Sequence, residues 1–315
     1  MKVLVTGGAG FIGSNLVELM LSEGHDVVVL DDLSSGYAEN LFAEARFVEG
    51  DVSASGVADS AARGCDAICH LAASVGNTRS IDNPVRDSEI NVIGTLRVLE
   101  AARMNGIQRV VASSSAGIFG ELKTLPIAED HPQDPDSPYG ASKLAAEKMC
   151  LVYNKLYGMN NVCLRYFNVY GRRQRYDAYG NVIPIFAEKM LRHQTVTIFG
   201  DGEQTRDFVH VTDVARANYL ATTSQAAAGA FNIGSASRIS VNELASLMTQ
   251  AAGEAVDVVH GDPRPGDVRD SLAAVEAARE AFGFRPTMDL KEGLEDYIEW
   301  LRLDPVTQQR WRTAD

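Results

Sequence analysis

The stretch that decides the fold is KVLVTGGAGFIG, residues 2–13. Its first five residues predict a buried β-strand, and the apolar spacing that follows predicts a helix through Leu21. The turn between them lets the backbone approach a pyrophosphate, and the helix N-terminus adds free N–H groups and the positive end of its dipole. A lone glycine triplet is weak evidence, because such turns also let a helix pack tightly on a strand. The glycines that make the turn are Gly7, Gly10 and Gly13.

The next expected strand, residues 26–30, ends in two acids, Asp31 and Asp32. A carboxylate at that position would accept hydrogen bonds from an adenosine ribose. Two acids would also repel a 2′-phosphate, and no Arg or Lys stands between Asp31 and Gly36. The pattern therefore favours NAD over NADP, and the alternative is a solvated acidic turn.

Strands and helices continue to alternate after these acids, which predicts a parallel sheet wound on both faces. A helix expected at about residues 85–105 contains Asn91, which either faces the ligand or is a polar residue on the helix surface. Small residues at the end of one strand, Leu71-Ala72-Ala73, would admit a flat cofactor. The further strands expected in this half are residues 46–52, 66–73, 109–115 and 161–166.

The strand at residues 109–115 changes abruptly from apolar to polar at Ser113-Ser114-Ser115. Hydroxyls at the carboxyl end of a parallel strand point into the crevice where such sheets bind ligands. Serines at strand ends are also common in turns, so this run indicates a site only together with other evidence.

The run SPYGASK, residues 137–143, predicts a helix start, with Ser137 as the N-cap and Pro138 at the first helical position. Tyr139 and Lys143 then lie on one helix face. The lysine charge is expected to lower the pKa of Tyr139, so that the tyrosine can act as a base near neutral pH. A Tyr and a Lys with this spacing also occur on ordinary helix surfaces. The pair therefore indicates a catalytic site only together with the rest of the sequence.

The composition of the 315 residues is that of a soluble globular protein, with 45% hydrophobic and 23% charged residues. A formal charge of −13 argues against nucleic-acid and anionic-membrane partners, which require broad positive surfaces. With no signal-peptide core and no apolar run of membrane-spanning length, we expect a cytoplasmic protein. The cysteines have no metal-ligand spacing, so we expect no metal and buried free thiols. They are Cys65, Cys69, Cys150 and Cys163.

Taken together, several runs resemble the extended short-chain dehydrogenase/reductases and, within them, the NAD-dependent nucleotide-sugar (UDP-hexose) 4-epimerases. The resemblance covers nearly the whole chain. It implies an α/β fold in which residues 1–170, with parts of about 205–235, form a Rossmann-type doubly wound parallel sheet. Residues 171–315 would mainly form a smaller mixed α/β lobe that binds the substrate. The matching runs are Thr6–Gly13, Asp31, His70–Ala73, Ser113–Ser115, Tyr139 with Lys143, and Leu164–Gly171.

The resemblance also implies roles for individual residues. Ser115, Tyr139 and Lys143 would be catalytic, NAD would be the cofactor, and a homodimer would form through the helices that hold Asn91 and Tyr139. Residues implied to bind the cofactor are Gly7, Gly10, Phe11, Ile12, Gly13, Asp31, Asp32, Asp51, Val52, Leu71, Ala72, Ala73, Asn91, Tyr139, Lys143 and Tyr166.

The second half contains arginines beside glycine turns, including Arg206 and Arg264. Converging guanidinium groups would clamp a diphosphate, whereas separate ones would be surface charges. The resemblance implies that a UDP-sugar is held there. The residues implied to contact it are Ser115, Asn168, Arg206, Arg264, Asp267 and Ser271.

The outcome of the reaction depends on which side chains follow the strand-end hydroxyl. The 4,6-dehydratases carry an Asp-Glu pair there and the UDP-glucuronate decarboxylases usually a Glu, whereas this chain has Ala116-Gly117. Phe119 stands where the family commonly has a tyrosine, so a hydroxyl is lost. The resemblance therefore favours C4 epimerisation.

The small Ser271, and the Gly171-Arg172-Arg173-Gln174 run, favour UDP-N-acetylglucosamine and UDP-N-acetylgalactosamine, with or without UDP-glucose and UDP-galactose. The alternatives are a UDP-uronic acid epimerase or decarboxylase, a net dehydrogenase that releases NADH, and a non-catalytic NAD-binding sensor.

Overall fold

The computed structural model describes residues 1–176, 181–224, 227–253, 255–263 and 269–314. A seven-stranded sheet, in the order β11-β6-β5-β4-β1-β2-β3, runs through the larger part, and every neighbouring pair in it is parallel. The predicted doubly wound α/β fold is confirmed. The strands are β1 (Lys2–Thr6), β2 (Asp26–Asp31), β3 (Arg46–Glu49), β4 (Ala67–His70), β5 (Val110–Ser115), β6 (Val162–Tyr166) and β11 (Gly229–Ile233).

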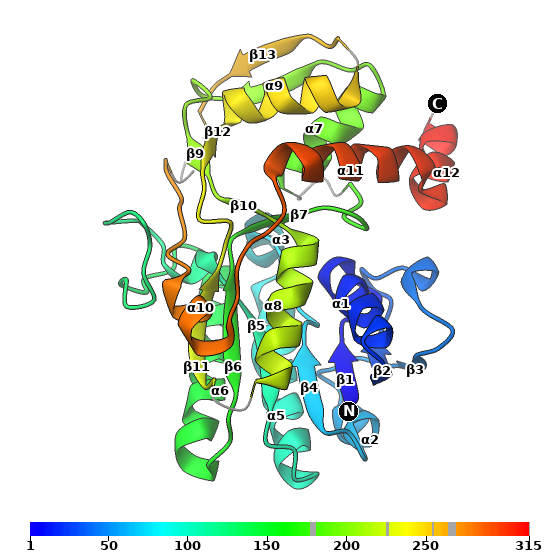
Figure 1. Ribbon diagram of the computed structural model, residues 1–315, viewed down its shortest axis with the longest axis vertical. Coiled ribbons are helices and arrows are strands. Elements are labelled where there is room, and N and C mark those ends of the chain that lie inside the picture. The colour runs from blue at the N-terminus through cyan, green and yellow to red at the C-terminus, as the bar shows by residue number, and fades with distance from the viewer. Residues whose placement is uncertain (177–180, 225–226, 254, 264–268, 315) are drawn as a thin grey trace.

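Both faces of this sheet are buried, because helices cover each of them, and successive side chains of a strand point to opposite faces. In β1, Val3 and Val5 belong to one apolar core and Leu4 to the other. The first core packs under α1 (Phe11–Ser22) and α8 (Val211–Thr223), which lie side by side in Figure 1. The helices on the opposite face are α2 (Val57–Ala62), α5 (Thr95–Met104) and α6 (Pro138–Tyr157).

The prediction of a single helix at residues 85–105 is wrong in detail. The chain forms α4 (Pro84–Ser88), a π-helical segment η2 (Glu89–Gly94) and then α5. A Cβ on Gly94 would lie 2.9 Å from a methyl group of Val52, so the wider turn passes close to the end of the sheet. Such π-helical turns often occur at functional sites. The short α3 (Asn77–Asp82) precedes this segment.

A second lobe lies beyond the carboxyl ends of the sheet strands, at the top of Figure 1. It has its own apolar core and short paired strands: β7 with β10, β8 with β13, and β9 with β12. The sequence pattern did not predict α12. The elements of this part are β7 (Asn168–Tyr170), α7 (Val182–Leu191), β8 (Val196–Phe199), β9 (Thr205–Arg206), β10 (Phe208–His210), β12 (Ile239–Ser240), α9 (Val241–Ala252), β13 (Val258–Gly261), α11 (Leu290–Leu303) and α12 (Pro305–Ala314). The helix α10 (Glu276–Phe282) packs instead beside β11, against the core of the large sheet (Figure 1).

All four cysteines are buried free thiols, as expected. Within the described ranges, no helix has the length and apolarity needed to cross a membrane. The same residues contain no group of three or more His, Cys, Asp or Glu side chains placed to hold a metal ion.

Candidate active site

The glycine turn after β1 forms a cradle that no side chain could enter. Gly7 has φ +71°, and a Cβ on it would lie 2.6 Å from the backbone nitrogen of Ala72. A Cβ on Gly13 would lie 2.0 Å from the carbonyl oxygen of Gly7, and one on Gly10 would lie 3.1 Å from the same oxygen. Only glycine therefore fits this tight turn, which leads directly into α1 and suits the close approach of a pyrophosphate to backbone N–H groups.

Asp31 stands beside this cradle at the end of β2. Its buried carboxylate accepts hydrogen bonds from the backbone N–H groups of Ala9, at 3.0 Å, and Leu33, at 2.9 Å. Burial raises the pKa of Asp31, and the two hydrogen bonds oppose that change. The carboxylate is thus tied to the glycine turn, at the place where an adenosine ribose would lie in a dinucleotide. Asp32 instead accepts hydrogen bonds from Ser34.

Asp51 lies just beyond β3 and forms an ion pair with Arg86 of α4, 2.8 Å away. Burial raises the pKa of Asp51, but hydrogen bonds from Ser53 and Arg86 outweigh it and leave the pKa lowered. Val52 is buried beside it. Contacts of these residues with the cofactor stay predictions.

A chain of buried side chains lies beneath the cradle. The Thr6 hydroxyl is 2.8 Å from Nδ1 of His70, and Nε2 of that histidine is 3.0 Å from the hydroxyl of Thr95. Thr95 donates onward to the backbone carbonyl of Asn91. Burial lowers the pKa of His70 to about 3, so the imidazole is neutral and bonds both hydroxyl groups. The chain fixes the end of β4, where Ala72 also donates to Thr6.

Asn91 is buried, so the alternative of a polar residue on the helix surface is wrong. Its amide exchanges two hydrogen bonds with the backbone of Ser74, at 2.9 and 3.0 Å. It also donates to Ser142 of α6 and to Asp87 of α4. The residue therefore joins the loop after β4 to the helix that carries Tyr139, and its direct contact with the cofactor stays a prediction.

The start of α6 forms as predicted. The Ser137 hydroxyl accepts a hydrogen bond from the N–H of Gly140 at 3.1 Å, and Pro138 occupies the first turn. The backbone N–H of Tyr139 donates to the hydroxyl of Ser80 on α3. Tyr139 is consequently held by a cap on its own helix and by a neighbouring helix.

The charge relation between Tyr139 and Lys143 differs from the expected one. Lys143 is buried, its ammonium donates to the Ser113 hydroxyl at 3.0 Å, and burial lowers the pKa of Lys143 to about 8. Burial raises the pKa of Tyr139, a hydrogen bond from Ser115 lowers it, and Asp87 raises it. The predicted lowering of the tyrosine pKa is therefore wrong in direction, because removal of the phenol from water outweighs the other effects.

Ser115 and Tyr139 meet around an exposed glycine. The Ser115 hydroxyl accepts from the N–H of Gly117 at 3.0 Å. A Cβ on Gly117 would lie 3.3 Å from that hydroxyl oxygen and 3.7 Å from the ring of Tyr139. The structure thus brings together the predicted hydroxyl and phenol, and any side chain at position 117 would touch both.

A buried ion pair that the sequence analysis did not predict supports this edge of the sheet. Arg165 of β6 and Glu147 of α6 form two hydrogen bonds, at 2.8 and 2.9 Å, and Ser114 donates to the same carboxylate. The Arg165 guanidinium lies 5.2 Å from the ring centre of Phe119. The ring that lacks the family's hydroxyl therefore packs against a buried cation.

Three predicted substrate residues come close together in the second lobe. Arg206 donates to the carbonyl of Thr205 at 2.9 Å, and the N–H of Ser271 donates to that same carbonyl at 3.1 Å. Asn168 donates to the carbonyl of Asp207, the residue after Arg206. Arg264 and Asp267 lie outside the described residues.

Tyr166, predicted to contact the cofactor, is almost fully buried, and its hydroxyl donates to Asn218 of α8 at 2.9 Å. This bond engages the hydroxyl inside the protein. A contact between the ring and the cofactor stays a prediction.

The arginines after Gly171, whose run in the sequence favours N-acetylated substrates, bind acids of the protein itself. Arg172 pairs with Asp296 of α11, and Arg173 pairs with Glu18 of α1. Arg175 forms a buried pair with Asp304 at 2.7 Å. Of these contacts, the Arg173–Glu18 pair joins the lobe to the sheet domain.

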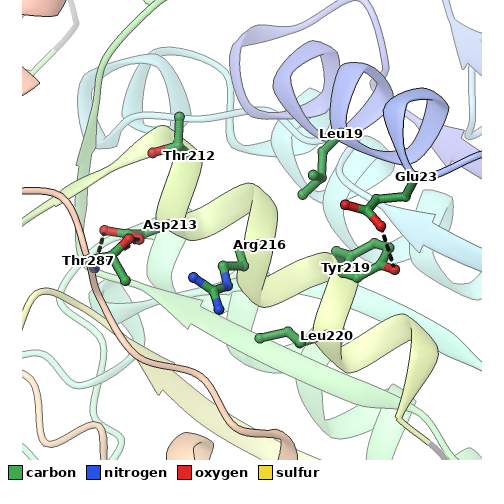
Figure 2. A pocket seen from close by; sticks show the side chains of 8 residues that line it. All are labelled: Leu19, Glu23, Thr212, Asp213, Arg216, Tyr219, Leu220 and Thr287. Atoms are coloured by element: carbon green, nitrogen blue, oxygen red, sulfur yellow. Dashed lines mark hydrogen bonds between the residues drawn. The ribbon is translucent and has the colours of Figure 1, made fainter.

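One further groove, of ≈ 400 Å³, lies between α1 and α8 (Figure 2). Its lining contains none of the predicted site residues. The groove is lined by Leu19, Glu23, Thr212, Asp213, Arg216, Tyr219, Leu220 and Thr287.

The sheet, the cradle and the Ser115–Tyr139–Lys143 group define a dinucleotide-dependent enzyme of the short-chain dehydrogenase/reductase type. Residues 3–234 match the model of the NAD dependent epimerase/dehydratase family. A relative in Methanocaldococcus jannaschii, named a putative UDP-glucose 4-epimerase, is 40% identical over 302 residues, 95% of this chain and 98% of its own. The chain belongs to this family, which confirms the resemblance, and NAD is its cofactor.

Solved structures agree with this assignment. The Thermus thermophilus UDP-glucose 4-epimerase in complex with NAD is 39% identical, with a TM-score of 0.88 over 96% of this chain and 99% of that one. A UDP-N-acetylglucosamine 4-epimerase from Methanobrevibacter ruminantium, in complex with UDP-N-acetylmuramic acid, is 33% identical, with a TM-score of 0.92 over 96% of this chain and 98% of that one.

Proposed function

We propose that this chain is a UDP-sugar 4-epimerase that inverts C4 of a UDP-hexose through a transient 4-keto sugar. The observation that carries the proposal is the meeting of Ser115 and Tyr139 around the exposed Gly117, with Lys143 one turn further along α6. Relatives named as UDP-glucose 4-epimerases, which match over nearly their whole length, support it.

The cofactor would be held by residues already in place. The glycine cradle would bind its pyrophosphate, Asp31 its adenosine ribose and Lys143 its nicotinamide ribose. When bound, NAD supplies a hydride acceptor that can return the hydride to the same carbon, so that no net oxidation results.

Tyr139 would remove the proton from the sugar 4-hydroxyl, and Ser115 would share that proton through its own hydroxyl. Because burial raises the pKa of Tyr139, the phenolate requires a nearby positive charge. Lys143 is suited to this role, since Ser113 fixes its ammonium one helical turn from the tyrosine. The 4-keto sugar would then turn in the site and be reduced on its other face.

The same oxidation precedes dehydration or decarboxylation in related enzymes, so the neighbouring side chains decide the product. Ala116 and Gly117 carry no acid, and Gly117 lies against both Ser115 and Tyr139. Neither position therefore supplies a carboxyl group that could catalyse the elimination of water from the sugar. This supports epimerisation.

The proposed substrates are UDP-N-acetylglucosamine and UDP-N-acetylgalactosamine, together with UDP-glucose and UDP-galactose. Ser271 supports this choice, because it is small and adjoins the strand that carries Arg206. The Arg172-Arg173 run no longer supports it independently, because both side chains bind acids of the protein. A UDP-uronic acid epimerase is the second candidate within the family.

We also propose a homodimer. Large apolar side chains are exposed on α4, η2 and α6, from the two helices expected to form the dimer interface, and on the adjoining α3. Their burial in a second copy would remove apolar surface from water. They are Ile81, Val85, Ile93, Val152 and Leu156. The proposed location in the cytoplasm rests on the four reduced, buried thiols.

The test is incubation of the purified enzyme with UDP-glucose, UDP-N-acetylglucosamine and UDP-glucuronate separately, with NMR analysis of products. We expect the C4 epimers of the first two, with no net change in NADH absorbance. Conversion of UDP-glucose alone would contradict the argument from Ser271. A Tyr139→Phe enzyme that kept full activity would contradict the catalytic assignment and favour a different class of function.

A further inference from the structure

Asp207, between β9 and β10, is a fully buried carboxylate. One of its oxygens accepts from both the backbone N–H and the hydroxyl of Ser235, each at 2.7 Å. The other accepts from the backbone N–H of Ala273 at 3.1 Å. Within the described part of the chain, these hydrogen-bond donors belong to uncharged residues.

These bonds join separate segments of the chain at one point. A Cβ on Gly234 would lie 2.7 Å from the carboxylate, so the segment around residues 234–236 passes directly over it. Burial raises the pKa of Asp207, and its hydrogen bonds oppose that change. A carboxylate that is costly to bury is retained here with several N–H and O–H partners.

The backbone of Asp207 holds a third segment. Its carbonyl oxygen accepts from the N–H of Asn168 at 3.2 Å and from the side-chain amide of Asn168 at 3.0 Å. The parallel pairing of β7 with β10 fixes this register. On its other side, Asp207 follows Arg206 directly, and its partner Ala273 is two residues from Ser271.

We propose that Asp207 is the positioning residue of the substrate site, presenting Asn168, Arg206 and Ser271 together to a nucleoside-diphosphate sugar. This inference rests on the proposed function, which makes those three residues the substrate contacts. A site that is ordered before binding loses less conformational freedom when the ligand arrives. Asp207 would therefore act on substrate affinity and leave the chemical step largely unchanged.

The chain contains a matched control in Asp213 of α8. This carboxylate is also buried, and it accepts from the N–H and hydroxyl of Thr287 and the N–H of Met288, at 2.8 to 3.0 Å. Figure 2 shows Asp213 and Thr287 together at the groove beside α8. The bonding is of the same kind, but it holds a segment that contains none of the predicted substrate residues.

The experiment compares Asp207→Asn with Asp213→Asn in the NAD-loaded enzyme. For Asp207→Asn we expect KM for the UDP-sugar and Kd for UDP to rise about tenfold, with kcat within about threefold and NAD content unchanged. For Asp213→Asn we expect a lower Tm with KM and Kd unchanged. Equal losses of Tm in both variants, with no change in KM or Kd, would overturn the proposal.

A second pair of substitutions, with smaller expected effects, is used if Asp207→Asn fails to fold. Ser235→Ala removes one donor to Asp207, and Thr287→Ala removes the equivalent donor to Asp213. Only Ser235→Ala should raise KM and the Kd for UDP, by about threefold. Kd is measured by calorimetry with UDP, so a wild-type enzyme that binds UDP but epimerises nothing would refute the proposed function while still testing Asp207. Unchanged Kd in Ser235→Ala would refute the role of Asp207.

Discussion

The ammonium of Lys143 donates a hydrogen bond to the hydroxyl of Ser113, 3.0 Å away, and so joins α6 to the end of β5. The helix therefore approaches the strand end where Ser115 meets Tyr139. Burial of this ammonium lowers the pKa of Lys143 to about 8, which brings its titration within reach of measurement in the folded enzyme.

We expect Lys143 to lose its proton near pH 8, because its pKa in the folded protein lies below the usual value of 10.5. The charge is thus present below pH 8 and lost above it. Carbon-13 NMR of enzyme produced with lysine labelled at Cε would follow this titration, and Lys143→Arg would identify the signal by removing it. A Lys143 signal that titrated above pH 10 would contradict the effect of burial.

Besides burial, the negative charge of Asp87 raises the pKa of Tyr139, because it disfavours the negatively charged phenolate. The other charged groups on neighbouring helices include Arg86, which pairs with Asp51, and Lys143. Asp87→Asn keeps an acceptor for the Ser142 hydroxyl but removes the charge. The acidic limb of the kcat/KM profile should then move to lower pH.

The control for this change is Ser142→Ala, which removes the hydrogen bond and keeps the carboxylate. The acidic limb of the kcat/KM profile of Ser142→Ala should stay at its wild-type pH. If both variants shifted the profile equally, loss of packing rather than charge would be responsible.

Gly117→Ala should reduce kcat, because its Cβ would press on the Ser115 hydroxyl at 3.3 Å. Displacement of a catalytic hydroxyl commonly costs about 100-fold in rate. NAD content should stay that of the wild type, because the glycine cradle is separate. Full activity in Gly117→Ala would show that the Ser115 position is not critical.

Asp304→Asn should destabilise the protein by about 3–5 kcal/mol, because it leaves the buried Arg175 without its charge partner. Arg175 also donates to Asn40, which binds the carbonyl of Ala9 in the glycine turn. We therefore also expect faster dissociation of NAD. Thermal unfolding and release of NAD measured by fluorescence would check both effects.

Asp296→Asn is the matched control, because its pair with Arg172 is much more exposed. Such pairs contribute about 0–1 kcal/mol. Equal loss of stability in the two variants would contradict the importance of burial at Asp304.

Local signals were sufficient to predict much of the site. The glycine turn, Asp31 at the end of β2 and the Ser137 cap each depend on neighbours in sequence, and the structure has the turn, the strand end and the cap where the pattern predicted them. The direction in which the pKa of Tyr139 is shifted could not be predicted, because it depends on burial of the phenol by segments distant in the sequence.

Contacts between distant segments were also beyond sequence reasoning. Glu147 of α6 and Arg165 of β6 are 18 residues apart in the chain, and Asp207 binds groups from residues 235 and 273. Each looks like an ordinary surface charge in the sequence. The fold alone makes them buried partners, and only the structure could reveal the Asp207 contacts.

The most direct test of C4 inversion without net oxidation uses UDP-galactose or UDP-N-acetylgalactosamine carrying deuterium at C4, in ordinary water. NMR should show the C4 epimer with the deuterium still at C4, while NADH absorbance stays constant. Loss of the label to solvent, or accumulation of NADH with a keto product, would contradict the account.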